Sequence, residues 1–341
     1  MLSSIAYAPD KCIESQFLIA TVVEIFEYRQ LDINHLLKGT GIFRQDLQLN
    51  NHKVSPLQFM TFIENALTLW PGDDLPFLLG QQWSSTQSGT FMESLFCCRG
   101  LSQMQKFWHQ YHWLSQPWLQ GWHWQTKNLH HLLLQLDIGA QLQQRFFIEL
   151  TLSSLVSTYK KLTHKTWQGH FSLPYAKPKQ LDQYYKYLGN DLSFSQPICV
   201  ISYSSRMHQQ PFENTNTQGA KLTWQQLKQY KQTAPFHIGL PAAIRLLLIS
   251  RSYSLPQIAD HLCLSTATLK RRLKAYNISF QQLQDQSNMQ QAIFLLAVSG
   301  ENNLTVAKQL QFADSNNFRR SFKRWTGLLP SQFKYWLNQS L

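Results

Sequence analysis

Two hydrophobic periodicities alternate along the first two thirds of the chain. Apolar residues at the spacing of a helix face predict helices over residues 13–29, 56–69, 103–114, 141–162 and 178–188. Shorter apolar runs, bounded by polar or turn-forming residues, predict strands over residues 122–126, 129–136, 167–173 and 198–203. This mixture predicts an α+β domain covering residues 1–210.

The pattern changes after residue 210. Residues 211–218 are polar and lack periodicity, so we predict a linker over residues 211–236. From residue 237 to residue 341, helical patterns follow one another with short breaks and without a strand signal. The sequence therefore predicts two domains, the second of them all-α, which suits a chain of 341 residues.

Two short helices joined by a tight turn are predicted over residues 255–276. Ser265 is placed to cap the second helix, in which Leu269, Leu273 and Tyr276 recur at helical spacing and point inward. The outer face of that helix is left with small, polar and basic residues, namely Thr266, Ala267, Lys270, Arg271 and Lys274. This pattern is typical of a helix-turn-helix unit, whose second helix enters the major groove of DNA.

The same arrangement recurs over residues 304–326. Phe318, Phe322 and Trp325 point inward at the spacing seen in the first unit. The outer face of the second helix is again polar and basic, and it consists of Ser315, Asn316, Asn317, Arg319, Arg320 and Lys323. The repetition predicts a second helix-turn-helix unit.

One long helix is predicted between the two units, over residues 280–298. Ser279 and Gln282 form a capping box at its start, and Gly300 lies just past its end. Such a helix spans roughly 28 Å, close to the ~34 Å between successive major-groove faces of B-DNA. Both units are therefore expected to dock on one side of a duplex.

The distribution of charge indicates a polyanionic partner that binds the last third of the chain. The formal net charge is +12, with 31 Lys and Arg against 19 Asp and Glu. Residues 236–341 hold 12 basic and 4 acidic residues. Their net charge of +8 is two thirds of the net charge of the whole chain. Such an excess favours binding to nucleic acid.

The C-terminal third resembles the DNA-binding domain of the AraC/XylS family of bacterial regulators. The resemblance is carried by SLPQIADHLCLSTATLKRRLKAYNISFQQL and VAKQLQFADSNNFRRSFKRWTGLLPSQFKYW, which together span much of residues 237–336. The second stretch departs from the family at Gln311, where glycine is usual, and Asn288 stands where the linker helix often carries arginine.

The N-terminal part resembles the effector-binding domain of the AraC subgroup of ornithine and virulence regulators. The matching stretches are Ile42–Leu79, Thr90–Trp113 and Tyr184–Phe194. The two resemblances imply a transcriptional regulator that binds double-stranded promoter DNA and contacts RNA polymerase. They also imply control by a small-molecule effector and possible homodimerisation. The expected sign of regulation is activation.

Docking of this kind sorts the outer side chains by chemistry. Arg271 and Arg320 suit bidentate contact with guanine, Asn316 and Asn317 suit adenine, and Ala267 suits a thymine methyl group. Lys270 suits either a base edge or a phosphate. Contacts with phosphates, which position the protein without specifying sequence, are expected from four other basic residues, Arg272, Lys274, Arg319 and Lys323.

An aromatic cluster in the N-terminal part offers a candidate effector pocket. Trp108, Trp113, Trp122 and Trp124 are expected to line it, because small-molecule pockets are largely apolar and aromatic. The alternative is that these rings are ordinary domain core. Five nearby histidines are more typical of a surface or pocket wall than of a metal site, and they are His109, His112, His123, His130 and His131.

The remaining features argue against several other classes of protein. No GxSxG, HExxH or phosphate-binding glycine loop occurs, so we predict no enzyme and no cofactor or metal. The five cysteines show no CxxC spacing. The apolar stretch at residues 17–26 is interrupted by Glu24 and lacks a basic leader, which predicts a cytoplasmic protein without a membrane span.

The sequence thus predicts an effector-controlled, sequence-specific DNA-binding activator with an α+β sensor domain and a double helix-turn-helix domain. One alternative keeps the DNA-binding domain but makes the N-terminal half a ligand-free dimerisation or protein-interaction module. A DNA-tethered enzyme is the other alternative, which the missing catalytic motifs disfavour.

Overall fold

A computed structural model describes residues 5–16, 18–49, 52–83, 89–213, 217–234, 236, 238–251 and 253–339. Its centre is a five-stranded sheet in the order β4–β5–β8–β6–β7. The strands are β4 (Leu119–Gln125), β5 (Leu129–Leu136), β6 (Gly169–Ser172), β7 (Leu192–Ser193) and β8 (Val200–Ser204). All neighbours are antiparallel except β6 and β7. The four predicted strands are confirmed, and β7 was missed because it is only two residues long.

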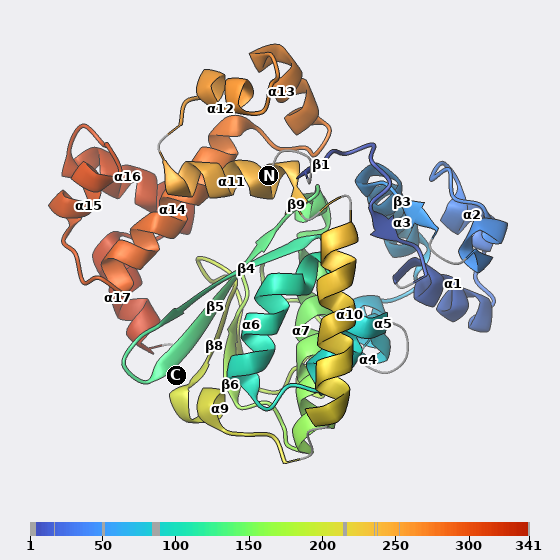
Figure 1. Cartoon of the computed structure of the whole chain (residues 1–341). Helices are drawn as coiled ribbons and strands as arrows, with labels where there is room; N and C mark the ends of the chain where they lie inside the picture. The colour runs from blue at the N-terminus through green and yellow to red at the C-terminus, as the bar shows by residue number, and fades with distance from the viewer. Residues whose placement is uncertain are drawn as a thin grey trace.

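Two long helices pack on one face of this sheet (Figure 1). They are α6 (Leu101–Tyr111) and α7 (Gln144–Thr163), and both were predicted, although α6 begins and ends slightly earlier than expected. Helix α4 (Leu75–Trp83) lies directly against α7. A Cβ on Gly80 of α4 would lie 2.7 Å from the carbonyl oxygen of Leu150, so the close approach of the two helices requires glycine.

The remaining N-terminal elements surround this layer. They are α1 (Leu18–Tyr28), α2 (Ile33–Leu37), α3 (Pro56–Leu69), α5 (Gly89–Phe96), α8 (Asp182–Tyr187) and α9 (Ser205–Gln209), with a small sheet of β2 (Ile13–Glu14) and β3 (Lys53–Val54). The prediction of helix from residue 13 is wrong at its start, because Ile13 pairs with Val54 in that sheet. Phe17, part of the predicted helix, lies outside the described residues.

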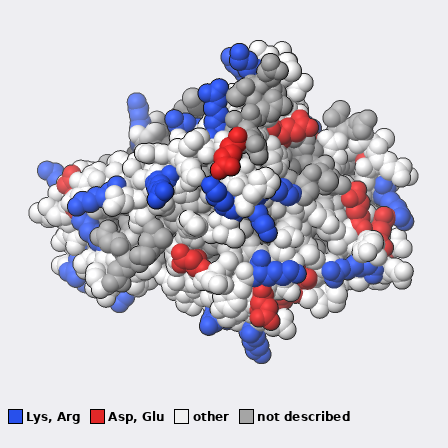
Figure 2. Space-filling model, turned by 90° about the horizontal axis from the view of Figure 1, so that it is seen from below, with Lys and Arg blue, Asp and Glu red and all other residues white. Residues whose placement is uncertain are grey.

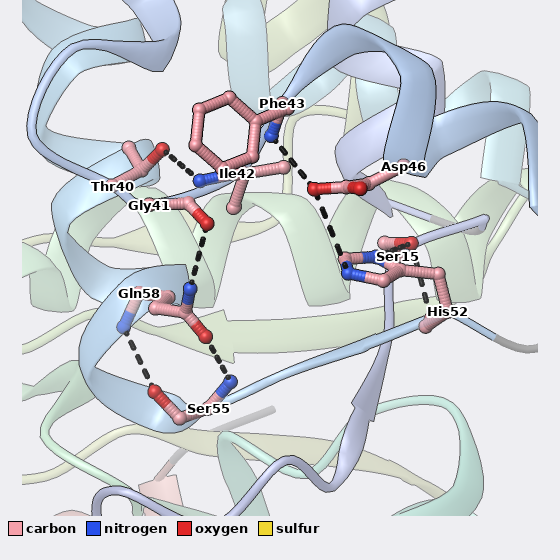
Figure 3. Close-up of polar contacts among 9 residues, drawn as sticks. All are labelled: Ser15, Thr40, Gly41, Ile42, Phe43, Asp46, His52, Ser55 and Gln58. Atoms are coloured by element: carbon pink, nitrogen blue, oxygen red, sulfur yellow. Dashed lines mark hydrogen bonds and ion pairs between the residues drawn. The ribbon is translucent and has the colours of Figure 1, made fainter.

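A polar network fastens the loop before β3 to its neighbours (Figure 3). Gln58 caps α3 together with Ser55 and also donates to the carbonyl oxygen of Gly41, at 3.2 Å. The hydroxyl of Ser15 lies 2.9 Å from Nδ1 of His52, whose Nε2 lies 3.9 Å from Asp46. These three residue types also occur in hydrolases, but Ser15 is 0 % exposed and no substrate reaches it. The network therefore stabilises the loop before β3 and has a structural role.

The segment predicted as a linker contains a docked helix. Helix α10 (Thr217–Thr233) packs against α5, and the ring of Trp224 stacks on Phe107 of α6 at 5.9 Å. Lys231 donates to the carbonyl oxygen of Gln110 at 3.4 Å. The polar composition of residues 211–236 concealed the few apolar residues that make these contacts. The domain boundaries drawn from the sequence remain a prediction.

The C-terminal part is helical, as predicted, apart from one short strand. Its helices are α11 (Leu240–Ser250), α12 (Leu255–His261), α13 (Thr266–Lys274), α14 (Phe280–Ala297), α15 (Asn303–Gln309), α16 (Ser315–Thr326) and α17 (Pro330–Gln339). Strand β9 (Ile238–Gly239) pairs in parallel with β1 (Ile5–Ala6), near the other end of the chain. The prediction of no strand is wrong here, because so short a strand depends on a remote partner and leaves no local pattern.

Both halves of the chain pack on the central sheet. The face opposite α6 and α7 presents Leu133 of β5 and Val200 of β8 to a core that includes Ile293 of α14 and Phe322 of α16. At the end of β5, the carboxylate of Asp137 lies 3.5 Å from Arg245 of α11. Both side chains are almost fully buried, and burial raises the pKa of Asp137 and lowers the pKa of Arg245. This ion pair therefore joins the two halves in a buried interface.

Histidine burial predicts a loss of stability in mild acid. His131 of β5 is 0 % exposed and lies within hydrogen-bond distance of Ser202 and Thr126. Burial first, and the neighbouring histidines second, lower the pKa of His131 from 6.5 to about 4. Below pH 6.5 the unfolded chain binds a proton that the folded chain does not, so stability falls as the pH drops toward 4. The loss from this one group reaches about 1.4 kcal/mol per pH unit.

We expect His131→Gln to make the free energy of unfolding less sensitive to pH between 6.5 and 4.5, as measured by urea titration. The exposed His164 provides the control, and His164→Asn should leave the pH dependence unchanged. An unchanged pH dependence in His131→Gln would show that this buried histidine does not cause the acid sensitivity.

Candidate nucleic-acid interface

The first helix-turn-helix unit consists of α12 and α13. The hydroxyl of Ser265 accepts a hydrogen bond from the backbone N–H of Thr268 at 3.1 Å and so caps α13, as predicted. Leu269 and Leu273 are at most 1 % exposed, and they pack in one core cluster with Ile258 of α12. Helix α13 therefore has a fixed inner face and a free outer one.

The second unit consists of α15 and α16. Asp314 caps α16 by accepting from the backbone N–H of Asn317 at 2.7 Å. Phe318 and Phe322 are 0 % exposed, and Trp325 is partly buried beside Phe312, with 5.9 Å between ring centroids. The three inward positions predicted for this unit are thus confirmed.

The turns of the two units have the same backbone geometry. The N–H of Leu264 donates to the carbonyl oxygen of Ala259 at 2.8 Å, and the N–H of Phe312 donates to Ala307 at the same distance. The residue before each donor, Cys263 or Gln311, has a positive φ, of 54° and 59° respectively. A left-handed residue favours glycine, which explains why the family usually carries glycine in place of Gln311.

Helix α14 holds the two units in a fixed relation. Its 18 residues are capped by Ser279, which accepts from the N–H of Gln282 at 3.2 Å, and they extend over roughly 27 Å. Arg324 of α16 reaches Asp285 of α14 at 3.1 Å. Asn288, which replaces the usual arginine, is half-buried on the same helix. An ion pair between α14 and the second unit is therefore present without an arginine at position 288.

The outer faces of both second helices are open to solvent. Most of the predicted DNA-contacting residues are exposed, namely Thr266, Ala267, Lys270, Arg271, Lys274, Asn316, Asn317, Arg319, Arg320 and Lys323. Arg272 and Ser315 are half-buried. In Figure 1 the first unit lies above the sheet and the second lies to its left, with α14 between them. By contrast, the face drawn in Figure 2 carries basic and acidic side chains interspersed.

Two of the predicted contacts are already engaged within the chain. The guanidinium of Arg272 lies 3.9 Å from the ring centroid of Tyr7, so it faces the N-terminal segment rather than the outer face of α13. The amide of Asn317 donates to Asp314 at 3.0 Å. Arg271, Arg320 and Asn316 are therefore the better placed candidates for contacts with base edges.

A cavity lies within the N-terminal half, between the sheet and helices α6 and α7. Of the four tryptophans predicted to form an effector pocket, only Trp108 lines it. Trp113 instead donates to the carbonyl oxygen of Phe236 at 3.0 Å, while Trp122 and Trp124 pack with the core on the opposite face of the sheet. The other lining residues were not predicted from the sequence, because they come from separate elements of the fold. They include Met92, Met104, Leu132, Leu155, Trp167 and Tyr203.

The histidines do not assemble into a metal site. Among the residues that the structure describes, no three His, Cys, Asp or Glu side chains are grouped so that they could hold a metal ion. Nε2 of His123 lies 2.8 Å from Nδ1 of His130, and the ring centroids of His130 and His208 are 3.7 Å apart in a stacked arrangement.

No helix in the described part of the chain is long and apolar enough to cross a membrane.

Comparison with known proteins places this architecture in a family. Residues 31–212, more than half of the chain, match the arabinose-binding N-terminal domain of the AraC transcription regulators. The chain belongs to the AraC family. Residues 258–335 also match a helix-turn-helix domain, in agreement with the two units described above. This AraC-family protein is therefore a DNA-binding transcriptional regulator, as its sequence predicted.

Individual relatives cover different shares of the regulator. The ornithine utilization regulator of Pseudomonas aeruginosa is 30 % identical over 163 residues, about half of each chain. An uncharacterized HTH-type transcriptional regulator of Mycobacterium tuberculosis is 23 % identical over 91 % of this chain and 93 % of its own. The transcriptional activator AggR of Escherichia coli is 31 % identical over 25 % of this chain and 32 % of its own.

One alignment with a solved structure extends over most of both chains at low sequence identity. The transcriptional regulator CdpR from Pseudomonas aeruginosa aligns over 91 % of this chain and 98 % of its own, with 16 % identity and a TM-score of 0.44.

The left-handed turn of the second unit predicts a stabilising substitution. Gln311→Gly removes the unfavourable contacts of a side chain at positive φ, so we expect the free energy of unfolding to rise by about 0.5–1 kcal/mol. The control is Gln309→Gly at the last residue of α15, where glycine has no conformational advantage, which should lower it by up to about 1 kcal/mol. Chemical denaturation of both variants measures the effect, and equal destabilisation by both would contradict the role assigned to Gln311.

Proposed function

We propose that this AraC-family regulator reads promoter DNA with α13 and α16 and activates transcription under the control of a small-molecule effector. The proposed recognition of DNA is supported by two exposed, basic helix faces that one capped helix, α14, joins. Arg271 and Arg320 would contact guanines, and Lys274 and Lys323 would contact phosphates. The proposed partners are double-stranded promoter DNA, RNA polymerase and a second copy of the chain, in the cytoplasm.

The proposed activation has support from one relative's name. That relative, AggR, is named a transcriptional activator, and it matches only a quarter of this chain. A transcription assay with purified RNA polymerase and the cognate promoter tests this part. Added regulator should raise the amount of transcript, and a fall would make the protein a repressor.

The proposed effector control is supported by the cavity between the sheet, α6 and α7. An effector that binds one arrangement of the two halves more tightly shifts the population toward that arrangement. The second candidate function, a ligand-free dimerisation module, has support in α10, which is docked on the outside of the N-terminal half with Leu222 64 % exposed. Only the first candidate predicts that a small molecule changes DNA affinity.

Two substitutions on α16 separate base reading from phosphate contact. Arg320→Ala should reduce discrimination at one base position by about 1–3 kcal/mol while leaving binding to random DNA nearly unchanged. Lys323→Ala should weaken binding to all sequences and reduce the slope of log K against log salt by about 1. Binding titrations on operator and random duplexes at several salt concentrations measure both effects.

The exposed Lys186 of α8 provides the control for loss of a positive charge. Lys186→Ala should leave both affinities unchanged, because this residue belongs to α8 in the N-terminal half, which packs against α7. Equal losses on operator and random DNA for Arg320→Ala would refute its role as a base reader.

A further inference from the structure

The cavity in the N-terminal half lies between two layers. The inner faces of β5 and β8 form one wall through Leu132, Leu134 and Ile201, and helices α6 and α7 form the other. It holds about 80 Å³ of free space. Its walls are mostly apolar, as in pockets for small organic molecules.

All polar groups on the cavity wall are neutral. Among the described residues that line it, none is Lys, Arg, His, Asp or Glu, and the polar ones are Gln105, Gln116, Thr151, Ser154, Thr158 and Tyr203. A charged ligand would lose its hydration here without gaining a counter-charge, which is costly in an apolar surrounding. The lining therefore selects against charged molecules.

Two glutamines contribute amide groups to the cavity lining. The side-chain oxygen of Gln116 accepts from the indole N–H of Trp108 at 2.7 Å. The side-chain oxygen of Gln105 accepts from the hydroxyl of Tyr203 at 3.3 Å. With both oxygens engaged, the donors that remain on these two amides are their NH₂ groups. A ligand here needs a neutral acceptor, such as a hydroxyl or carbonyl oxygen.

We propose that this cavity binds a small, uncharged and largely apolar molecule whose oxygen accepts hydrogen bonds from Gln105 and Gln116. The proposal rests on the effector control proposed above and names the ligand class. It excludes ornithine, which the name of one relative suggests, because a diamino acid carries three charged groups at neutral pH and the lining offers no charge to meet them.

The position of the cavity connects the ligand to the DNA-binding half. Leu132 and Leu134 of β5 line the cavity, whereas Leu133 between them points to the opposite face and belongs to the core of the second helix-turn-helix unit. In β8, Ile201 likewise lines the cavity, whereas Val200 belongs to the core on the opposite face. A single layer of strands therefore separates the ligand from the helices that hold α16. A ligand that shifts these strands shifts the second unit.

A series of straight-chain 1-alkanols from butanol to decanol tests the ligand class on the full-length protein. We expect the best-fitting alkanol to raise the melting temperature by about 5 °C at a hundredfold excess over its Kd. Ornithine and the alkylammonium ion of the same length should produce no shift. Stabilisation by the charged compounds instead, or by none of the series, would overturn the proposal.

Two neighbouring substitutions on α7 locate the site. Leu155 lines the cavity and Val156 does not, although both are half-buried. Leu155→Phe fills the space and should abolish the stabilisation by the alkanol, whereas Val156→Phe should retain it. An alkanol shift that persists in Leu155→Phe would place the binding site elsewhere and refute the assignment.

A DNA-binding titration with and without the best alkanol separates this proposal from the proposed function. An alkanol that binds the cavity and changes operator affinity supports both. An alkanol that binds the cavity without changing operator affinity confirms the ligand class and contradicts the effector control on which the proposal rests.

Discussion

The rest of the structure depends on one sheet that is buried on both faces. Strands β5 and β8 send alternate side chains to two separate cores, because successive residues of a strand point in opposite directions. One core lies under α6 and α7 and contains the cavity, and the other holds α14, α16 and α17. A strand in this position cannot shift on one side without a response on the other, since protein interiors are close-packed.

Polar contacts fix how the two halves meet. The buried pair of Asp137 and Arg245 contributes little net stability, because the cost of removing two charges from water offsets much of their attraction. Breaking it would leave one buried charge unpaired, so it disfavours other arrangements of α11 on the sheet. The hydroxyl of Tyr276, just after α13, donates to the carbonyl oxygen of Ala6 at 2.9 Å and ties the first reading unit to the N-terminal segment.

The parts of this protein that could be predicted are those whose signals are local. The caps at Ser265 and Ser279 and the inward residues of α13 and α16 depend on neighbours within one or two helical turns. The sites that depend on distant contacts were not predictable in the same way. The residues that line the cavity belong to several elements, including α5, α6, α7, β5 and β8. Of the four tryptophans predicted from one stretch of sequence, one therefore lines the cavity and three lie outside it. Strand β9 and the docking of α10 were missed for the same reason.

In the proposed function, two reading helices on one polypeptide, held apart by α14, engage one side of a duplex. The most direct test is a hydroxyl-radical footprint of the full-length protein on the DNA upstream of its own gene. Each bound chain should protect two patches on the same face of the DNA, one helical turn (about 10 base pairs) apart. A single protected patch per chain, or two patches on opposite faces of the duplex, would show that the two helices do not engage one side of the DNA together.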